Sequence, residues 1–236
     1  MASRGASSAS ACARRRVRGV VFDMDGTLTL PTIDFGALYR ECGLERGKAD
    51  VLAHLASLPE GGAERARVVA VIERYEREGR EQMALMPGAL ELGAWLDRAG
   101  VPRGLVTRNV YASVEHFHAR CWSGLAPFAP ALAREFEPPK PSPAALLHIA
   151  QSWGVPPSEL LMVGDSAKDD VVAGNRAGAA TVLLDAEGRY GELGEALEGE
   201  RVPTHVVRSL AELPALIDEG FELLAPAAAA EPLTTP

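Results

Sequence analysis

The chain has 236 residues, of which 47% are hydrophobic and 24% charged, proportions that are ordinary for a globular protein of one or two domains. Acids outnumber bases by 32 to 24, and the net charge of −8 argues against general nucleic-acid binding and against a polybasic membrane surface. No uninterrupted apolar run approaches the ~20 residues that span a bilayer. The cysteines, Cys12, Cys42 and Cys121, are too widely spaced for a disulfide framework or a zinc site and fit a reducing compartment.

The first residues differ in composition from the rest. Residues 1–22 contain arginines and serines but no acid. Such a start is typical of an organelle transit peptide, which would place the protein in a chloroplast or a mitochondrion. The alternative is a disordered basic tail without an addressing role, and the protein would then be cytoplasmic. In either case we expect residues 1–16 to lie outside the fold.

Residues 17–23 have the length and the β-branched content of a buried strand. The apolar run ends at Asp23 and Asp25, and Gly26 follows at once, so the backbone can turn sharply. Two carboxylates at the tip of a buried strand concentrate negative charge, and oxygen ligands at this density suit Mg²⁺. The alternative is a surface loop that happens to carry two acids.

A helical segment follows the first strand. Residues 32–86 contain apolar residues at helical spacing. The pairs Glu73–Arg77 and Glu76–Arg80 lie four apart with the acid first, which favours an exposed helical flank. We therefore expect this segment to be an inserted cap over the strand tip, with possible substrate contacts at Asp34, Phe35, Tyr39 and Arg40.

Strand and helix patterns alternate in the remainder of the chain. Helices are predicted over 89–99, 110–119, 143–153, 169–177 and 210–219, and strands over 101–107, 130–136, 160–164, 180–184 and 205–207. This order predicts a doubly wound parallel α/β sheet built from residues 17–31 and 87–220, with its ligand site at the carboxyl ends of the strands. The Ala/Pro/Thr-rich tail, residues 221–236, is predicted to be disordered.

Three later stretches place further polar residues at or just after predicted strand ends. The Thr107 hydroxyl and the amides after it can hold phosphoryl oxygens, although a threonine at a strand end is more often structural. Lys140 lies among prolines that restrict its backbone and could neutralise charge in a transition state, unless it is simply solvated. Asp165 and Asp169 follow the strand at 160–164, where the alternative reading is helix-capping acids.

The segment Asp23-Met24-Asp25-Gly26-Thr27 resembles the first motif of the haloacid dehalogenase superfamily of phosphohydrolases. Thr107, Lys140 and the glycine-aspartate, three residues, aspartate pattern at 164–169 resemble its second, third and fourth motifs and follow in the same order. The resemblance covers residues 17–218. It is strongest to plant and algal hydrolases of the superfamily and to enzymes that resemble phosphoglycolate phosphatases.

The resemblance implies a Rossmann-like core with a small helical cap, Mg²⁺ as cofactor, and a role for each motif residue. Asp23 would be the nucleophile that forms an aspartyl phosphate, and Asp25 the general acid and base. The metal ligands would be Asp23, the backbone carbonyl of Asp25, and Asp165.

The remaining roles implied by the resemblance concern phosphate binding and support. The phosphate would be bound by Thr107, Arg108, Asn109 and Lys140. Asp169 would bind the metal through water or orient Lys140. Asp170 is an additional acid, which could simply favour the start of the following helix by its charge.

These features predict a Mg²⁺-dependent phosphatase that acts on a small phosphorylated metabolite and is monomeric by default. A capped site disfavours phosphoprotein substrates, because the lid must close over the ligand. One alternative is a phosphomutase, which returns the phosphoryl group to its substrate. Another, of a different class, is a binding or scaffold protein that uses the fold without turnover.

Overall fold

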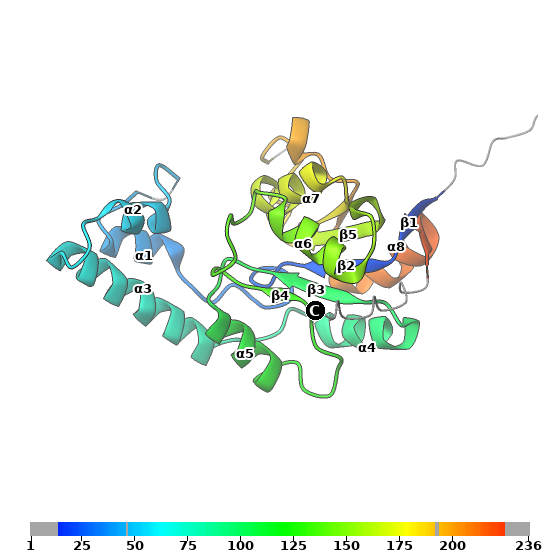
Figure 1. The fold of residues 1–236 in the computed structure, drawn as a ribbon, viewed down its shortest axis with the longest axis horizontal. Coiled ribbons are helices and arrows are strands. Elements are labelled where there is room, and N and C mark those ends of the chain that lie inside the picture. Colours follow the sequence, from blue (N-terminus) through cyan, green and yellow to red (C-terminus); the bar gives the residue numbers. More distant parts are fainter. Residues whose placement is uncertain (1–13, 46, 192–193, 225–236) are drawn as a thin grey trace, which may run out of the picture.

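A six-stranded parallel sheet forms the centre of the molecule (Figure 1). The computed structural model describes residues 14–45, 47–191 and 194–224. The strand order is β4-β3-β2-β5-β6-β7, and every pairing in this sheet is parallel. The strands are β2 (Gly19–Phe22), β3 (Arg103–Val106), β4 (Ala131–Leu132), β5 (Leu160–Gly164), β6 (Ala180–Leu184) and β7 (His205–Val207). The predicted α/β fold is therefore confirmed.

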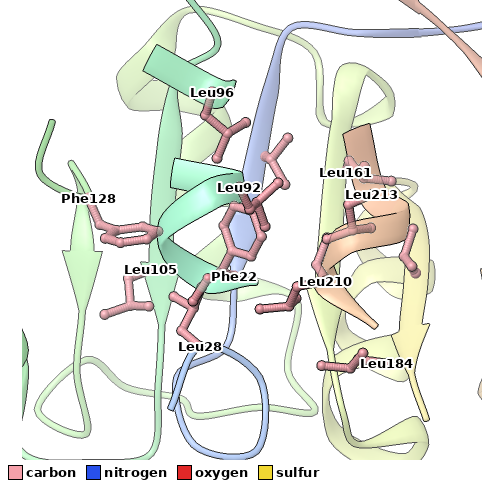
Figure 2. Packing of buried hydrophobic residues seen from close by; sticks show 14 of the residues in the cluster. Phe22, Leu28, Leu92, Leu96, Leu105, Phe128, Leu161, Leu184, Leu210 and Leu213 are labelled. Atoms are coloured by element: carbon pink, nitrogen blue, oxygen red, sulfur yellow. The ribbon is translucent and has the colours of Figure 1, made fainter. Parts of the chain in front are cut away.

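Helices cover both faces of this sheet. Along β2, Val20 and Phe22 point to one hydrophobic cluster and Val21 to another, because successive strand residues alternate between faces. The first cluster packs α4 (Ala89–Ala99), α5 (Tyr111–Arg120) and α8 (Leu213–Gly220) against the sheet. Figure 2 shows Leu92 and Leu96 of α4 and Leu213 of α8 within it. The second packs α6 (Ala144–Trp153) and α7 (Val172–Ala177) on the opposite face. Burial on both sides explains why these strands are continuously apolar in sequence.

Three helices are inserted between β2 and α4. They are α1 (Phe35–Glu41), α2 (Val51–Ser57) and α3 (Ala63–Glu81), and Figure 1 shows them to one side of the sheet, with α3 running toward α5. We call this segment the cap. It has an apolar cluster of its own, which includes Leu38, Val68 and Ile72. The two connections to the core run side by side, since Leu30 N donates to Ala84 O at 2.9 Å.

The observed fold extends beyond two predicted boundaries, at the end of the leader and at the start of the tail. Strand β1 (Arg15–Val17) pairs in parallel with β8 (Phe221–Leu223), so part of the predicted leader and part of the predicted tail are joined in a small sheet. This pairing covers backbone that composition alone had assigned to disorder. The rest of both segments, residues 1–13 and 225–236, lies outside the described residues.

The other differences are local. The predicted strand at 130–136 contracts to the two residues of β4, and the predicted helix at 169–177 begins instead with a π-helical turn, Ala167–Val171. Three short 3₁₀ turns complete the described elements: Pro157–Glu159, Gly199–Arg201 and Leu210–Glu212. Among the described helices, none has the length and apolar character needed to cross a membrane.

Candidate active site

The carboxyl ends of β2, β3 and β5 meet at one edge of the sheet. Because β2 lies between β3 and β5, Asp23 is placed beside the residues that follow the other two strands. The Asp23 backbone N–H donates to Val163 O at 2.9 Å, which extends the pairing of β2 with β5 to the strand tip. The Asp23 residue is 7% exposed. The topology thus concentrates the predicted site residues at the switch point of the sheet.

Lys140 bridges two buried carboxylates. Its Nζ donates to Asp23 Oδ1 at 2.5 Å and to Asp170 Oδ1 at 2.6 Å. Burial alone would lower the pKa of Lys140, but the two carboxylates outweigh it and raise that pKa. Burial raises the pKa of Asp23 to about 6 and that of Asp170 to about 7, against the opposing effect of the lysine charge. These three groups form a charged triad that water scarcely reaches.

An acidic cluster suited to a hard cation overlaps this triad. Oxygen atoms of Asp23, Asp165 and Asp170 all lie within 4.8 Å of one another. Burial also raises the pKa of Asp165. Three carboxylates and no nitrogen or sulfur ligand are the donor set that Mg²⁺ or Ca²⁺ prefers. The residues present therefore fit the predicted metal.

Gly26 makes room for this cluster. Its φ of +83° lies in the left-handed region, and a Cβ at this position would lie 2.6 Å from Asp165 Oδ2. A side chain here would both strain the turn and push the Asp165 carboxylate away. The sharp turn predicted after Asp25 is thus needed for two separate reasons.

The Asp25 carboxylate is held apart from the acidic cluster. Its Oδ1 accepts a hydrogen bond from Thr29 Oγ1 at 2.8 Å, and its Oδ2 accepts one from Asn109 Nδ2 at 2.6 Å. Asp25 is not among the three residues of the cluster. Two donors from different elements fix the orientation of this carboxylate, as a group that exchanges protons with a bound ligand requires.

Of the three residues predicted after β3, two lie at the site and one reaches the cap. The Thr107 hydroxyl is buried and accepts a hydrogen bond from Asn109 N at 3.1 Å, so its proton is free to be donated. Arg108 instead forms an ion pair with Asp50, with 2.5 Å between Nη2 and Oδ2. Asp50 is the N-cap of α2. Arg108 therefore links the core to the cap in this structure.

The prediction that Asp169 orients Lys140 is wrong, because Asp170 does so. Asp169 stays near Ser166, whose Oγ accepts from Asp169 N and donates to Asp169 Oδ2, each at 3.2 Å. The π-helical turn from Ala167 explains the shift. A wider turn returns the chain to the strand tip one residue later than an α-helix would. Asp170 then accepts from Ser166 N at 3.0 Å and faces Lys140.

Arg189 is a site residue that sequence reasoning missed. Its Nη2 lies 2.8 Å from Asp165 Oδ2 and also donates to Asp165 O at 2.9 Å. The loop after β6 places it there through Asp185, which is fully buried and accepts from Arg189 N at 2.7 Å. Arg208 also forms an ion pair with Asp185 at 2.6 Å. No motif in the sequence distinguishes this arginine from the many others.

A crevice separates α3 from the core beside Asp25. It is lined on the core side by Asp25, Asn109 and Ser113, and on the cap side by Thr32, Ile33, Glu76, Gly79, Arg80 and Met83. None of the four cap residues predicted to contact substrate lines it. Two of those four have structural roles within the cap: Asp34 is the N-cap of α1, and Tyr39 Oη accepts from Val51 N.

The comparisons with known proteins agree with this geometry. A family model described as haloacid dehalogenase-like hydrolase matches residues 17–178. The chain belongs to this family. The resemblance seen in the four motifs is therefore confirmed.

Relatives support the same assignment. A haloacid dehalogenase-like hydrolase domain-containing protein of Arabidopsis thaliana is 44% identical over 89% of this chain and 88% of its own. A phosphoglycolate phosphatase of Pseudomonas syringae pv. tomato is 30% identical over 88% of this chain and 82% of its own. Among solved structures, a hydrolase from Pseudomonas syringae shares the fold, with a TM-score of 0.66 and 22% identity over 87% of this chain and all of that one. The chain is a hydrolase that acts on phosphate monoesters.

Proposed function

We propose that this protein is a Mg²⁺-dependent phosphatase that hydrolyses a small phosphorylated metabolite through an aspartyl phosphate on Asp23. The observation that supports this most strongly is the buried triad, in which Lys140 Nζ lies between Asp23 and Asp170. Asp23, Asp165 and Asp170 together carry more negative charge than Lys140 neutralises. A phosphate dianion can therefore bind beside Asp23 only if a further cation offsets this charge. Mg²⁺ bound by Asp23, Asp165 and Asp170 would supply that charge and align the phosphoryl oxygens.

The first step is attack by a carboxylate oxygen of Asp23 on phosphorus. A P–O bond to Asp23 forms as the ester P–O bond breaks. Asp25, held by Thr29 and Asn109, gives its proton to the departing alkoxide. The product alcohol then leaves with that proton, and Asp25 remains as a carboxylate.

The second step reverses the role of Asp25. It removes a proton from water, whose oxygen attacks phosphorus and breaks the bond to Asp23. Inorganic phosphate leaves, and Asp23 and the protonated Asp25 are restored. In both steps the Thr107 hydroxyl, oriented by the Asn109 backbone N–H, and the Lys140 ammonium would donate to the phosphoryl oxygens.

The proposal extends to substrate size and location. A cap over the strand tips favours a small metabolite, because a bulky phosphoprotein would prevent closure. The phosphoglycolate phosphatase relatives favour the same class of ligand. We further propose a monomer, and entry into an organelle directed by the Arg- and Ser-rich start of the chain.

The proposal is tested by phosphate release from an aryl phosphate, sugar phosphates, nucleotides and phosphoglycolate, measured with Mg²⁺ and with EDTA. We expect release that requires Mg²⁺ and is abolished by Asp23→Asn. Transfer that needs a bisphosphate activator, with little phosphate released, would favour a phosphomutase. Folded, Mg²⁺-loaded protein that releases phosphate from none of these compounds would contradict the proposal.

A further inference from the structure

Arg80 is a half-buried arginine without a partner. Within the described chain its side chain makes neither a hydrogen bond nor an ion pair. Its ordinary partner on a helix would be Glu76, one turn earlier. The sequence predicts that exposed pair, and the prediction is wrong, because Glu76 is 8% exposed and faces the core.

Glu76 forms an ion pair with Arg134 of the core instead. Arg134 Nη2 lies 2.5 Å from Glu76 Oε1, in a geometry too bent for a hydrogen bond. A hydrogen bond from Arg134 Nε to Arg108 O at 2.9 Å fixes this arginine in place. The Arg80 guanidinium, with five donors, is therefore partly removed from water and has nothing to donate to.

The other arginines near the site are already engaged. Arg108 pairs with Asp50, Arg134 with Glu76, and Arg189 with Asp165. Among these four described arginines, Arg80 is thus the one whose charge has no carboxylate partner. A half-buried guanidinium without a partner beside an active site indicates that the ligand carries a negative charge.

The position of Arg80 indicates which part of the ligand it meets. It lines the crevice together with Asp25 and Asn109. In the proposed mechanism Asp25 protonates the leaving oxygen, so the alcohol portion of the substrate must extend from Asp25 into this crevice. The crevice now has a volume of about 10 Å³, room for about one water, so α3 must withdraw slightly to admit it.

We propose that Arg80 is a specificity-determining residue that binds a second anionic group, a carboxylate or a phosphoryl group, on the alcohol portion of the substrate. The planar guanidinium matches either group with two parallel hydrogen bonds. This inference rests on the proposed phosphatase function. It adds that the substrate is a phosphate monoester whose alcohol is itself an acid.

The test compares matched substrates that differ in this one anionic group. Phosphoglycolate is paired with ethyl phosphate, and propane-1,3-diol bisphosphate with its monophosphate, so the two pairs separate a carboxylate from a second phosphoryl group. The proteins are wild type, Arg80→Gln, Arg80→Lys and the control Arg77→Gln, which removes an exposed arginine from the same helix. Unchanged thermal midpoints show that the variants are folded.

For the anionic member of at least one pair, we expect Arg80→Gln to lower kcat/KM by about 10- to 100-fold, the range for a lost charge-assisted interaction. The member without the second anionic group should change less than about twofold, because it offers Arg80 nothing to bind. Arg80→Lys should retain part of the preference because it keeps the charge, and Arg77→Gln should retain all of it.

Two results would overturn the inference without touching the phosphatase proposal. One is turnover of an aryl phosphate by wild-type protein that shows no preference for either anionic substrate. The other is an equal loss on both members of each pair in Arg80→Gln, which would mean a structural role. If wild type releases phosphate from none of these compounds, including the aryl phosphate, the phosphatase proposal fails and this inference fails with it.

Discussion

Replacing Lys140 by methionine should destabilise the protein by an amount that depends on pH. The Lys140 side chain is 3% exposed and contacts carboxylates at 2.5 and 2.6 Å. Removing one partner from a buried ion pair costs about 3–5 kcal/mol, because the remaining charge stays buried. For a chain of this length that corresponds to a fall of about 6–20 °C in thermal midpoint.

The pH dependence follows from the two carboxyls that lose the lysine. The pKa of Asp23 is about 6 and that of Asp170 about 7 in the folded protein, both above the ordinary value of 3.8. Carboxyl groups whose pKa is raised on folding stabilise the folded state at low pH. Their contribution to the free energy of unfolding is lost as the pH rises through the folded pKa. Lys140 lowers both pKa values, so Lys140→Met raises them further. The variant should therefore lose more stability at pH 8 than at pH 5.

The assay is urea unfolding at pH 5 and pH 8 in EDTA, so that no bound metal replaces the lysine charge. The matched control is Lys168→Met, an exposed lysine in the π-helical turn, which should change the free energy of unfolding by less than about 0.5 kcal/mol. A loss below about 1 kcal/mol in Lys140→Met, or an equal loss at both pH values, would refute this reasoning.

Three further predictions concern the metal site and the cap. Gly26→Ala should abolish most Mg²⁺-dependent activity, whereas Gly124→Ala, also at positive φ but with nothing within 4 Å, should affect stability alone; comparable activity in the two variants would contradict this. Calorimetry should find Mg²⁺ affinity more than about tenfold weaker at pH 5 than at pH 8, because Asp23 must lose a proton from a pKa of about 6 and Asp170 from a pKa of about 7; a pH-independent affinity would refute it. Asp50→Asn keeps the helix cap but loses the ion pair to Arg108, so chemical denaturation should show that the free energy of unfolding falls by less than about 1 kcal/mol. A larger fall would show that the pair is more than an exposed contact.

The strand-tip residues could be predicted because parallel strands bring their carboxyl ends together. Asp23, Thr107 and Asp165 each follow an apolar run, and the strand order β3-β2-β5 makes those runs neighbours. The alternation of strand and helix was enough to predict that these residues converge, whereas their roles came from the resemblance to the haloacid dehalogenase motifs. The cap helices could be predicted for a similar reason, since their apolar residues recur at helical spacing.

The errors arise where a local backbone choice or a distant partner decides the outcome. A π-helical turn is not visible in the apolar spacing, and it exchanged the expected places of Asp169 and Asp170. Glu76 and Arg80 have ideal spacing for a surface pair, but Glu76 forms its ion pair with Arg134, which lies far along the chain. The approach of Arg189 to Asp165 depends on a loop fixed by a buried acid, and no periodicity records that.

The central claim is that Asp23 forms the covalent intermediate and that Asp25 supplies the base for its hydrolysis. The most direct test is the Asp25→Asn variant with para-nitrophenyl phosphate, whose leaving group needs no protonation. The account predicts a burst of one nitrophenolate per active site followed by slow turnover. Borohydride treatment of the quenched protein should convert Asp23 to homoserine. A linear time course without a burst, or homoserine at any other aspartate, would contradict the account.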